Sequence, residues 1–520
     1  MVDLPLRKSF ALSPGSVLLA AAFAFLAALA FVGVFLIGKL GAVVVIGTVV
    51  FAVLFILVRN QRLFCLWGAV LSAPLAVSKS FVIIPHMGGA GAYTIEPLDI
   101  CLVLLLAFMI RDRIRGLRPK FRWTPVGFWW GGMMAFGLVS VALGPLRQLS
   151  AEEVFRMAKC YLLFFVIVNE ALRLRQIMHV VAALVVVVLI QSGAAVVQGV
   201  LHKDLGLQVL GEATQETIRY AAQATYLGAA DEGFRVSGLI GHPNLLAAML
   251  AMLLPICVAL LFARIPTLSK LAVAVATALG VVALLLTLSR TGWTTFGVAF
   301  AILFGFSFVH PRLRTRFIFA RVAFLAGAAA VLAAFSGTII KRLYQSDPGA
   351  LDFRFEWNHV AWDFVMSHPL FGVGLNTFVY HLPGNTKYGG IEGLNQRFGD
   401  QWPAAHNIYL LTWSEQGTLG FVFLIGLNLY LLLIGLKNTN RYVNDGVFAV
   451  NMGCVAGLVS LLIDGLTSFY IRNPAPARIF WIFAGLMVAI HYWNRANAPN
   501  GPRQRVWPIG ARHQAVPQPT

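Results

Sequence analysis

Residues 176–201 read QIMHVVAALVVVVLIQSGAAVVQGVL and contain no aspartate, glutamate, lysine or arginine. A helix needs about 20 apolar residues to cross the hydrocarbon core of a bilayer, because its backbone groups find no water there and must bond to one another. This stretch therefore predicts a membrane-spanning helix. The whole chain is 59% hydrophobic and 12% charged, whereas soluble domains carry about 25% charged residues. Such a composition excludes a soluble protein.

Similar runs recur along the chain. Together they predict about fourteen spans, judged by length and charge. The first run is longer than the apolar core of a cleaved signal peptide, which has about 7–15 residues, so we expect it to be retained. The expected fold is an all-α polytopic transmembrane helix bundle. The other uncharged runs are 16–38, 40–58, 123–146, 236–263, 271–289, 291–311, 322–340 and 446–463, and weaker candidates are 63–84, 97–110, 159–172, 407–436 and 478–494.

Basic residues gather in alternate loops, which predicts the orientation of the chain. An excess of lysine and arginine marks the cytoplasmic loops of membrane proteins. We therefore expect both termini to be cytoplasmic and the more acidic loops to be outside. The basic residues that define the inner loops are Arg59, Arg62, Arg111, Arg113, Arg115, Arg118, Lys120, Arg122, Arg173, Arg175, Arg264, Lys270, Arg312, Arg314, Arg316, Arg321, Lys437 and Arg441.

The same distribution accounts for the net charge of +19. A nucleic-acid-binding protein would concentrate its positive charges on one face, so we expect no nucleic-acid partner. The 5 cysteines lie in or beside predicted spans and lack CxxC spacing. They are interpreted as buried thiols, with neither disulfides nor a metal site.

Four parts follow from these patterns: N-terminal helices at 1–235 with an outer loop near 201–241, a core at 236–436, C-terminal helices at 437–494 and a disordered cytoplasmic tail at 495–520. The core includes a large outer loop at 341–406. Helical spacing of its apolar residues predicts an amphipathic helix from Asp352 to Ser367, which ends before Pro369 and lies along the membrane–water boundary. The apolar stripe comprises Phe353, Trp357, Val360, Ala361, Phe364 and Val365.

Four motifs lie where predicted outer loops meet spans, so we expect them at one interface. Arginine and histidine recur in them without a matching cluster of acids. The motifs are Arg235–Asn244, Ser289–Trp293, Arg354 with Trp357 followed by His368–Gly374, and His406–Asn407 followed by Gly417 and Gly420.

Arg235, Arg290 and Arg354 are the candidate residues for binding a diphosphate. Arginine binds phosphate oxygens through two parallel hydrogen bonds and stays charged at any working pH. His406 is the candidate base, because an imidazole with a pKa near 6.5 suits the removal of a proton from a sugar hydroxyl. The combination predicts glycosyl transfer from a lipid diphosphate, with His406 and Arg290 as catalytic residues.

Structural interpretations of these residues remain open. An arginine at the end of a span can simply anchor it at the interface, and an interfacial histidine can be structural. Gly417 and Gly420 fit helix packing. Glu415, inside a span, is either functional or paired with a basic neighbour, and Asn407 is a supporting candidate. The loop histidines lack the close spacing of a zinc motif; they are His359, His368 and His381.

The motifs together resemble the O-antigen ligase and Wzy-type polysaccharide polymerase family. The pattern at 406–420, His-Asn followed by Gly-x-x-Gly, is similar to the family signature. The segments Arg235–Asn244, Ser289–Gly292 and Pro369–Gly374 resemble its other recurrent motifs in the same order. The resemblance covers roughly residues 235–435, and the spans after the large loop also follow the family layout.

The resemblance implies a metal-independent glycosyltransferase of the bacterial inner membrane that needs no cofactor and works at the periplasmic face, where the large loop would lie. Its donor would be a glycan on undecaprenyl diphosphate. Its acceptor would be another lipid-linked glycan for a polymerase, with a chain-length regulator as partner, or a lipid A core for a ligase. The essential arginines and histidine of the family map onto Arg235, Arg290, Arg354 and His406. The count of about fourteen spans favours a polymerase.

The principal alternative is a lipid-linked oligosaccharide flippase or another polysaccharide transporter. Transporters place ionisable residues or broken helices near the middle of the membrane and often contain internal repeats. In this sequence the centres of the predicted spans are nearly free of charge, and the polar residues gather in outer segments. The pattern therefore favours a transferase. A purely structural scaffold would leave the aromatic outer loop and its motifs unexplained.

Overall fold

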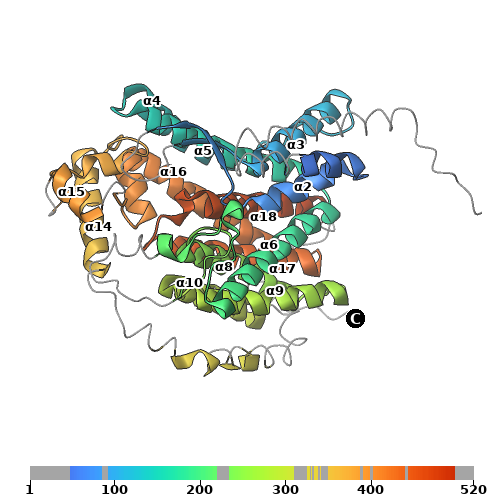
Figure 1. The fold of residues 1–520 in the computed structure, drawn as a ribbon. Helices are drawn as coiled ribbons and strands as arrows, with labels where there is room; N and C mark the ends of the chain where they lie inside the picture. The colour runs from blue at the N-terminus through green and yellow to red at the C-terminus, as the bar shows by residue number, and fades with distance from the viewer. Residues whose placement is uncertain are drawn as a thin grey trace, which may run out of the picture. The chain divides into compact units, whose positions relative to one another are not determined.

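In the computed structural model, helices make up most of the chain (Figure 1). The structure describes residues 47, 49–84, 92–218, 234–309, 350–386, 390–398, 402–439 and 443–497, with scattered positions between 322 and 340. Two compact units are distinguished, at 1–65 and 66–520. In the first, the rings of Phe51 and Phe64 pack with their centroids 5.3 Å apart. Everything that follows concerns the second.

Seven of the described helices are long and apolar enough to cross a membrane, which makes the protein an all-α integral membrane protein. They are α4 (Val126–Leu143), α6 (Leu174–Leu201), α8 (Pro243–Leu261), α9 (Thr267–Leu286), α16 (Ile408–Thr439), α17 (Asp445–Asp464) and α18 (Pro474–Asn497).

Each of these helices coincides with a predicted span. The run 236–263 is helical only from Pro243, because residues 236–242 form a loop. The predicted span 16–38 lies outside the described residues, as do parts of 40–58 and 322–340.

The structure also describes further helices, two strands and short 3-10 turns. They are α2 (Gln61–Ser72), β1 (Lys79–Ile83), β2 (Ala92–Ile95), α3 (Pro97–Ile114), α5 (Arg147–Glu170), η1 (Gln208–Leu210), α10 (Arg290–Val309), α14 (Ala350–Ser367), η2 (Phe378–His381), α15 (Ile391–Phe398) and η3 (Tyr470–Arg472).

The predicted span at 63–84 is wrong. α2 ends at Ser72 after 12 residues, which reach only about 18 Å, too short for a core about 30 Å thick. Pro74 explains the end, because proline lacks a backbone N–H and disfavours a helical residue before it. The chain then forms an antiparallel hairpin, in which β1 pairs with β2 and Lys79 lies opposite Ile95. An apolar strand and an apolar helix cannot be told apart by composition alone.

α8, α17 and α18 form the centre of the bundle, since 83%, 83% and 89% of their apolar windows are buried, and α8 packs closely on α17. Small residues let the backbones of α8 and α17 approach closely, as is common between membrane helices. A Cβ atom on Gly453 would lie 2.4 Å from Cα of Ile256, and one on Gly457 would lie 2.2 Å from the carbonyl oxygen of Met252. The pairing is antiparallel, so α8 begins where α17 ends.

Several helices begin at one end of the bundle. α16 begins beside the end of α17, where the Ile408 N–H donates to the Gly465 carbonyl over 2.9 Å. α5 also begins there, since the Ser150 hydroxyl donates to the Leu375 carbonyl over 2.8 Å. α8 begins and α9 ends at the same end. We call it the His406 end.

α14 confirms the helix predicted between Asp352 and Ser367. Its apolar stripe from Trp357 to Val365 is covered by protein, while the position of the helix along the membrane–water boundary stays a prediction. The stripe packs against other residues of the outer loop, and the Trp357 indole donates to the Pro403 carbonyl. The loop supplies enough aromatic side chains to bury this face itself. The buried cluster includes Trp357, Val360, Ala361, Phe364, Phe378, Leu394, Phe398 and Trp402.

Gly457→Ala is expected to destabilise the protein by about 1–3 kcal/mol, because the added methyl group meets the backbone of α8. The matched control is Gly297→Ala on α10, where a Cβ atom would have no neighbour within 4 Å. Thermal unfolding in detergent should show a lower Tm for Gly457→Ala than for the control. Equal Tm values would contradict the close packing of α8 and α17.

Candidate functional site

The centre of the His406 end is a break in α16. Gly417 has φ 66° and ψ −176°, and this interrupts the helix between two straight parts. The carbonyls of Ser414 and Glu415 lose their usual helical partners at the break and accept instead from the N–H groups of Val373 and Gly374, over 2.8 and 3.0 Å. Buried backbone groups need such partners. The segment 369–374 thus completes the hydrogen bonding of α16.

Glycine is required where the two segments meet. A Cβ atom on Gly417 would lie 2.1 Å from the Leu370 carbonyl oxygen, and one on Gly372 would lie 2.4 Å from the carbonyl carbon of Glu415. Both residues have positive φ, which glycine adopts without strain. Two motifs that the sequence presented separately are therefore one structural unit. Gly417 is a break with a backbone contact, and not only a helix-packing position as the simpler interpretation held.

His406 lies just before α16 and is held in a defined orientation. Its Nδ1 donates to the Ala404 carbonyl over 3.1 Å, so the neutral ring carries its lone pair on Nε2. The Phe469 ring packs edge-on against it, with the centroids 5.2 Å apart. Burial, followed by the positive charge of Arg354, lowers the pKa of His406 to about 4. The imidazole is therefore neutral near pH 7 and can accept a proton.

Asn407 has a structural role. Its side-chain oxygen accepts from the N–H groups of Tyr409 and Leu410 over 3.0 and 3.1 Å. These donors would otherwise have no partner in the first turn of α16, and asparagine is a preferred residue for capping them. Asn407 thus fixes where α16 starts and, with it, the position of His406.

Arg354 belongs to α14 of the outer loop and lies near His406. It lies near enough for its charge to lower the pKa of the imidazole, and it also interacts electrostatically with Asp464 at the end of α17. Its Nε is buried without a hydrogen-bond partner. A buried donor of this kind is costly unless something binds it. The guanidinium therefore has capacity left for a ligand.

Arg235 is 8% exposed and bonded within the protein. Its Nε donates to the Thr287 carbonyl over 3.0 Å, and its Nη2 donates to Asn244 Oδ1 over 2.6 Å. The residue thereby joins the end of α9 to the start of α8. Ser289 and Arg290 follow shortly after Thr287. The motifs Arg235–Asn244 and Ser289–Trp293 therefore meet here.

Arg290 is the first residue of α10 and is half-buried. It follows a strained junction, because Leu288 has φ 53°, a left-handed conformation that is rare for a bulky residue. The strain turns the chain sharply between α9 and α10 and sets Arg290 at the start of a helix. The N-terminal end of a helix attracts anions. Arg290 and the helix start together provide positive potential at the His406 end.

His242, to which the sequence assigned no chemistry, links these elements. Its Nδ1 accepts from the Asn244 N–H over 3.1 Å at the start of α8. Its ring also lies close enough to His406 to help lower the pKa of that imidazole. Arg235, Asn244 and His242 therefore connect the α9 junction to His406, and Arg354 also lies close to that imidazole. The structure thus places Arg235, Arg354 and His406 at one end of the bundle.

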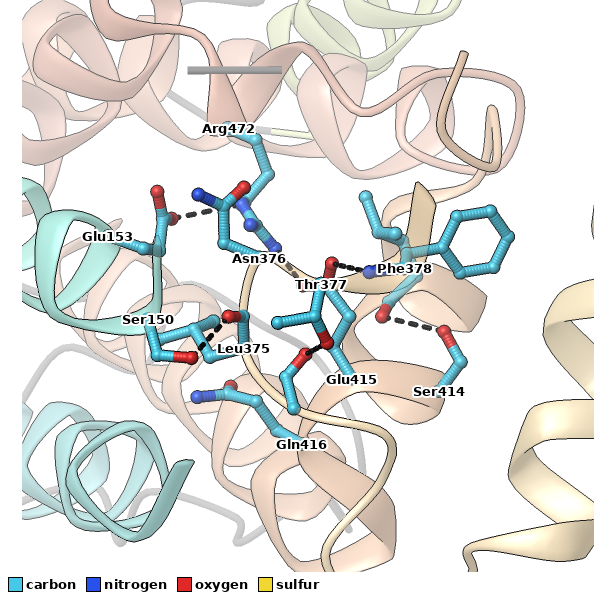
Figure 2. Close-up of polar contacts among 12 residues, drawn as sticks. Ser150, Glu153, Leu375, Asn376, Thr377, Phe378, Ser414, Glu415, Gln416 and Arg472 are labelled. Atoms are coloured by element: carbon cyan, nitrogen blue, oxygen red, sulfur yellow. Dashed lines mark hydrogen bonds and ion pairs between the residues drawn. The ribbon is translucent and has the colours of Figure 1, made fainter. Parts of the chain in front are cut away.

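Glu415 is not part of this group. Its carboxylate pairs with Arg472 Nη1 at 2.8 Å and accepts from the Phe378 N–H over 3.2 Å (Figure 2). Arg472 Nε also pairs with Glu153 at 3.0 Å, and its two acidic neighbours raise the pKa of the guanidinium. Of the two interpretations left open for Glu415, pairing with a basic residue is the one observed.

Arg472, Glu153 and Arg156 form an ion-pair network that sequence reasoning missed. Arg156 pairs with Glu153 and also donates to the Arg472 carbonyl. The signal was present, because Arg156 and Arg472 are basic residues in segments that the charge bias assigns to the outer side. Such exceptions need acidic partners when they are buried. Glu153 is only three residues from Arg156, but both acidic partners of Arg472 lie too far away in the sequence to be paired with it by inspection.

Glu415→Gln is expected to lower the stability of the protein by about 3 kcal/mol, because one partner of a buried ion pair is removed. The control is Glu392→Gln, at an exposed position on α15. Denaturant or thermal unfolding in detergent measures the difference. If both variants unfold alike, the Glu415–Arg472 pair does not support α16.

Comparison with known proteins identifies one part of the chain. Residues 275–425 match the model of the O-antigen ligase family, whereas no curated protein matches the chain. The matching segment runs from α9 through the break in α16, so it includes Arg290, Arg354, His406 and the segment 369–374. Arg235 lies outside it. The protein is therefore an integral membrane protein in which residues 275–425 are similar to the O-antigen ligase family.

Proposed function

We propose that the protein is a membrane glycosyltransferase that joins undecaprenyl-diphosphate-linked glycan units at the periplasmic face of the bacterial inner membrane. The observation that carries the proposal is His406, a neutral imidazole with its Nδ1 bonded to Ala404. It lies beside Arg354, at the same end of the bundle as the start of α10 with Arg290. A base and positive charges at one end are what transfer from a diphosphate requires.

In the reaction, His406 Nε2 takes the proton of an acceptor hydroxyl. The hydroxyl oxygen forms the new bond to C1 of the donor sugar. The bond between C1 and the diphosphate oxygen breaks, and its electron pair leaves with the diphosphate. Positive charge close to the departing group stabilises the transition state. These steps use groups of the chain alone and need neither a metal ion nor a cofactor.

The three arginines receive different roles. Arg354 has an unbonded buried Nε, and Arg290 stands at a helix start, so we assign the diphosphate to these two. Arg235 donates to Thr287 and Asn244. We assign it to holding the α8–α9 junction that positions Arg290.

A polymerase is preferred to a ligase. The preference rests on the number of spans counted in the sequence, which is about fourteen, or about thirteen once the segment 63–84 is removed. A polymerase would pass the growing chain to another lipid-linked repeat, whereas a ligase would pass the finished chain to a lipid A core. Purified protein incubated with the lipid-linked repeat alone separates them, because only a polymerase makes a ladder of longer products from that substrate. New glycosidic bonds would also exclude a simple transporter.

His406→Ala and Arg290→Ala are each expected to lower the rate of glycan formation by about a hundredfold or more, the usual loss when a general base or a charge on the leaving group is removed. The readout is glycan formed by purified protein in detergent. The control is His359→Ala, an exposed position on α14. Near-normal activity of either variant, with intact protein, would refute its assigned role.

The value of kcat/KM, which reports the free enzyme, is expected to stay nearly constant from about pH 8 to pH 5 and to fall below that, because protonation of His406 removes the base and its pKa without donor is about 4. Arg354→Gln removes a positive charge that lowers this pKa, so the acid limb of the normalised profile should move to higher pH. Arg354→Lys keeps the charge and should leave the limb in place. A wild-type limb near pH 6.5, the value of a free histidine, would contradict the assignment.

A further inference from the structure

A cavity at the His406 end lies apart from the residues around His406. It has a volume of about 140 Å³ and lies between the β1–β2 hairpin and the starts of α3 and α18, with α5 along one side. Its lining includes Thr94, Glu96, Glu152, Phe155 and Arg478. We call it the hairpin cavity. None of the roles assigned above uses it.

The cations around this cavity are neutralised by acids of the protein. Arg478 pairs with Glu96 and donates to the Ala73 carbonyl over 3.0 Å. Lys159 pairs with Asp99 at 2.7 Å and donates to the Thr94 carbonyl over 3.1 Å. Positive charge that is already matched in this way leaves little attraction for an anionic ligand.

Of the two described acids that line the cavity, Glu152 forms no ion pair, whereas Glu96 Oε2, which also has no hydrogen-bond partner, lies 3.8 Å from Lys159 Nζ. The Glu152 side chain is 3% exposed, and its Oε2 has no hydrogen-bond partner. The neighbouring Glu153 is paired with Arg156 and Arg472, so those cations do not serve Glu152 as hydrogen-bond donors. A buried carboxyl oxygen without a partner is costly, since it has given up its bonds to water. Glu152 Oε2 is therefore available to form a hydrogen bond with a molecule that enters the hairpin cavity.

The surroundings of Glu152 select the chemistry of a ligand. A metal ion would need several free oxygen ligands, whereas Glu96 and Asp99 are engaged by cations. The volume holds about four or five waters at liquid density, which suits one ring of a hydroxylated molecule. Phe155 adds an apolar surface, and the Tyr93 ring packs on it with the centroids 5.4 Å apart. A hydroxyl donor with an apolar ring face fits both features.

We propose that the hairpin cavity binds one neutral sugar residue, with a sugar hydroxyl bonded to Glu152 Oε2 and the face of the ring against Phe155. On the proposed function, this residue belongs to the acceptor glycan and lies at a distance from its reacting hydroxyl. The site is connected to the reacting end, because α5 carries Glu152 beside Glu153, which pairs with Arg472, and Arg472 pairs with Glu415 on α16. Binding in the cavity thus positions the acceptor through a rigid part of the protein.

The test uses the repeat-unit oligosaccharide released by mild acid from the glycan of the cells that make the protein. Its affinity is measured by titration calorimetry on full-length protein carrying His406→Ala, which removes turnover. Adding Glu152→Ala should weaken binding about tenfold or more, the usual loss for a hydrogen bond to a charged group. Adding Glu392→Ala, at the exposed position on α15, should not change it. Unchanged affinity in the Glu152→Ala protein would overturn the proposal.

A second variant shows whether a loss of binding comes from the site and not from misfolding. Phe155→Leu keeps an apolar side chain at a position 38% exposed, and it should weaken binding while the Tm stays that of the parent. In active protein, Glu152→Ala should raise KM for the acceptor and leave kcat almost unchanged. An unchanged KM overturns the sugar site but not the transferase. Oligosaccharide binding in protein that forms no glycosidic bond supports the site and refutes the transferase.

Discussion

The break in α16 at Gly417 is the constraint on which the rest of the His406 end depends. A helix that is interrupted inside a membrane protein must find new partners for its free backbone groups. Here the segment 369–374 supplies them, through Val373 and Gly374. That segment follows directly on α14, so the break also fixes the outer loop. Arg354 on α14 and His406 before α16 are thereby brought to the same place.

Several buried arginines at the His406 end are paired with acids of the protein. Arg472 joins Glu153 and Glu415, while Arg478 joins Glu96. Buried ions that are paired in this way add little net stability, but removing one partner is costly. They therefore fix the relative positions of α3, α5, α16 and α18 more than they strengthen them. Arg354 Nε and Glu152 Oε2 are buried at this end as well, and neither atom has a hydrogen-bond partner among the described residues.

The sequence predicted the seven described helices that could cross a membrane, because a long apolar run in a membrane protein has almost only one outcome. It failed at 63–84, where Phe81 and its neighbours are apolar in a strand as they would be in a helix. His406 could be identified because its motif is local. The partner of Glu415 could not, since Arg472 is 57 residues away. The apolar face of α14 was recognised, but whether lipid or protein covers it depends on contacts that no local pattern contains.

The low pKa of His406 follows from the same placement. A pKa of about 4 keeps the imidazole neutral, but it also makes a weak base, and Arg354 is one cause of it. In the proposed mechanism the donor brings a diphosphate to Arg354. The negative charge of the diphosphate offsets the positive charge of Arg354. An anion near an imidazole raises the pKa of the imidazole. His406 would thus become a stronger base only when the donor is bound, which ties proton removal from the acceptor to the presence of the sugar it will attack.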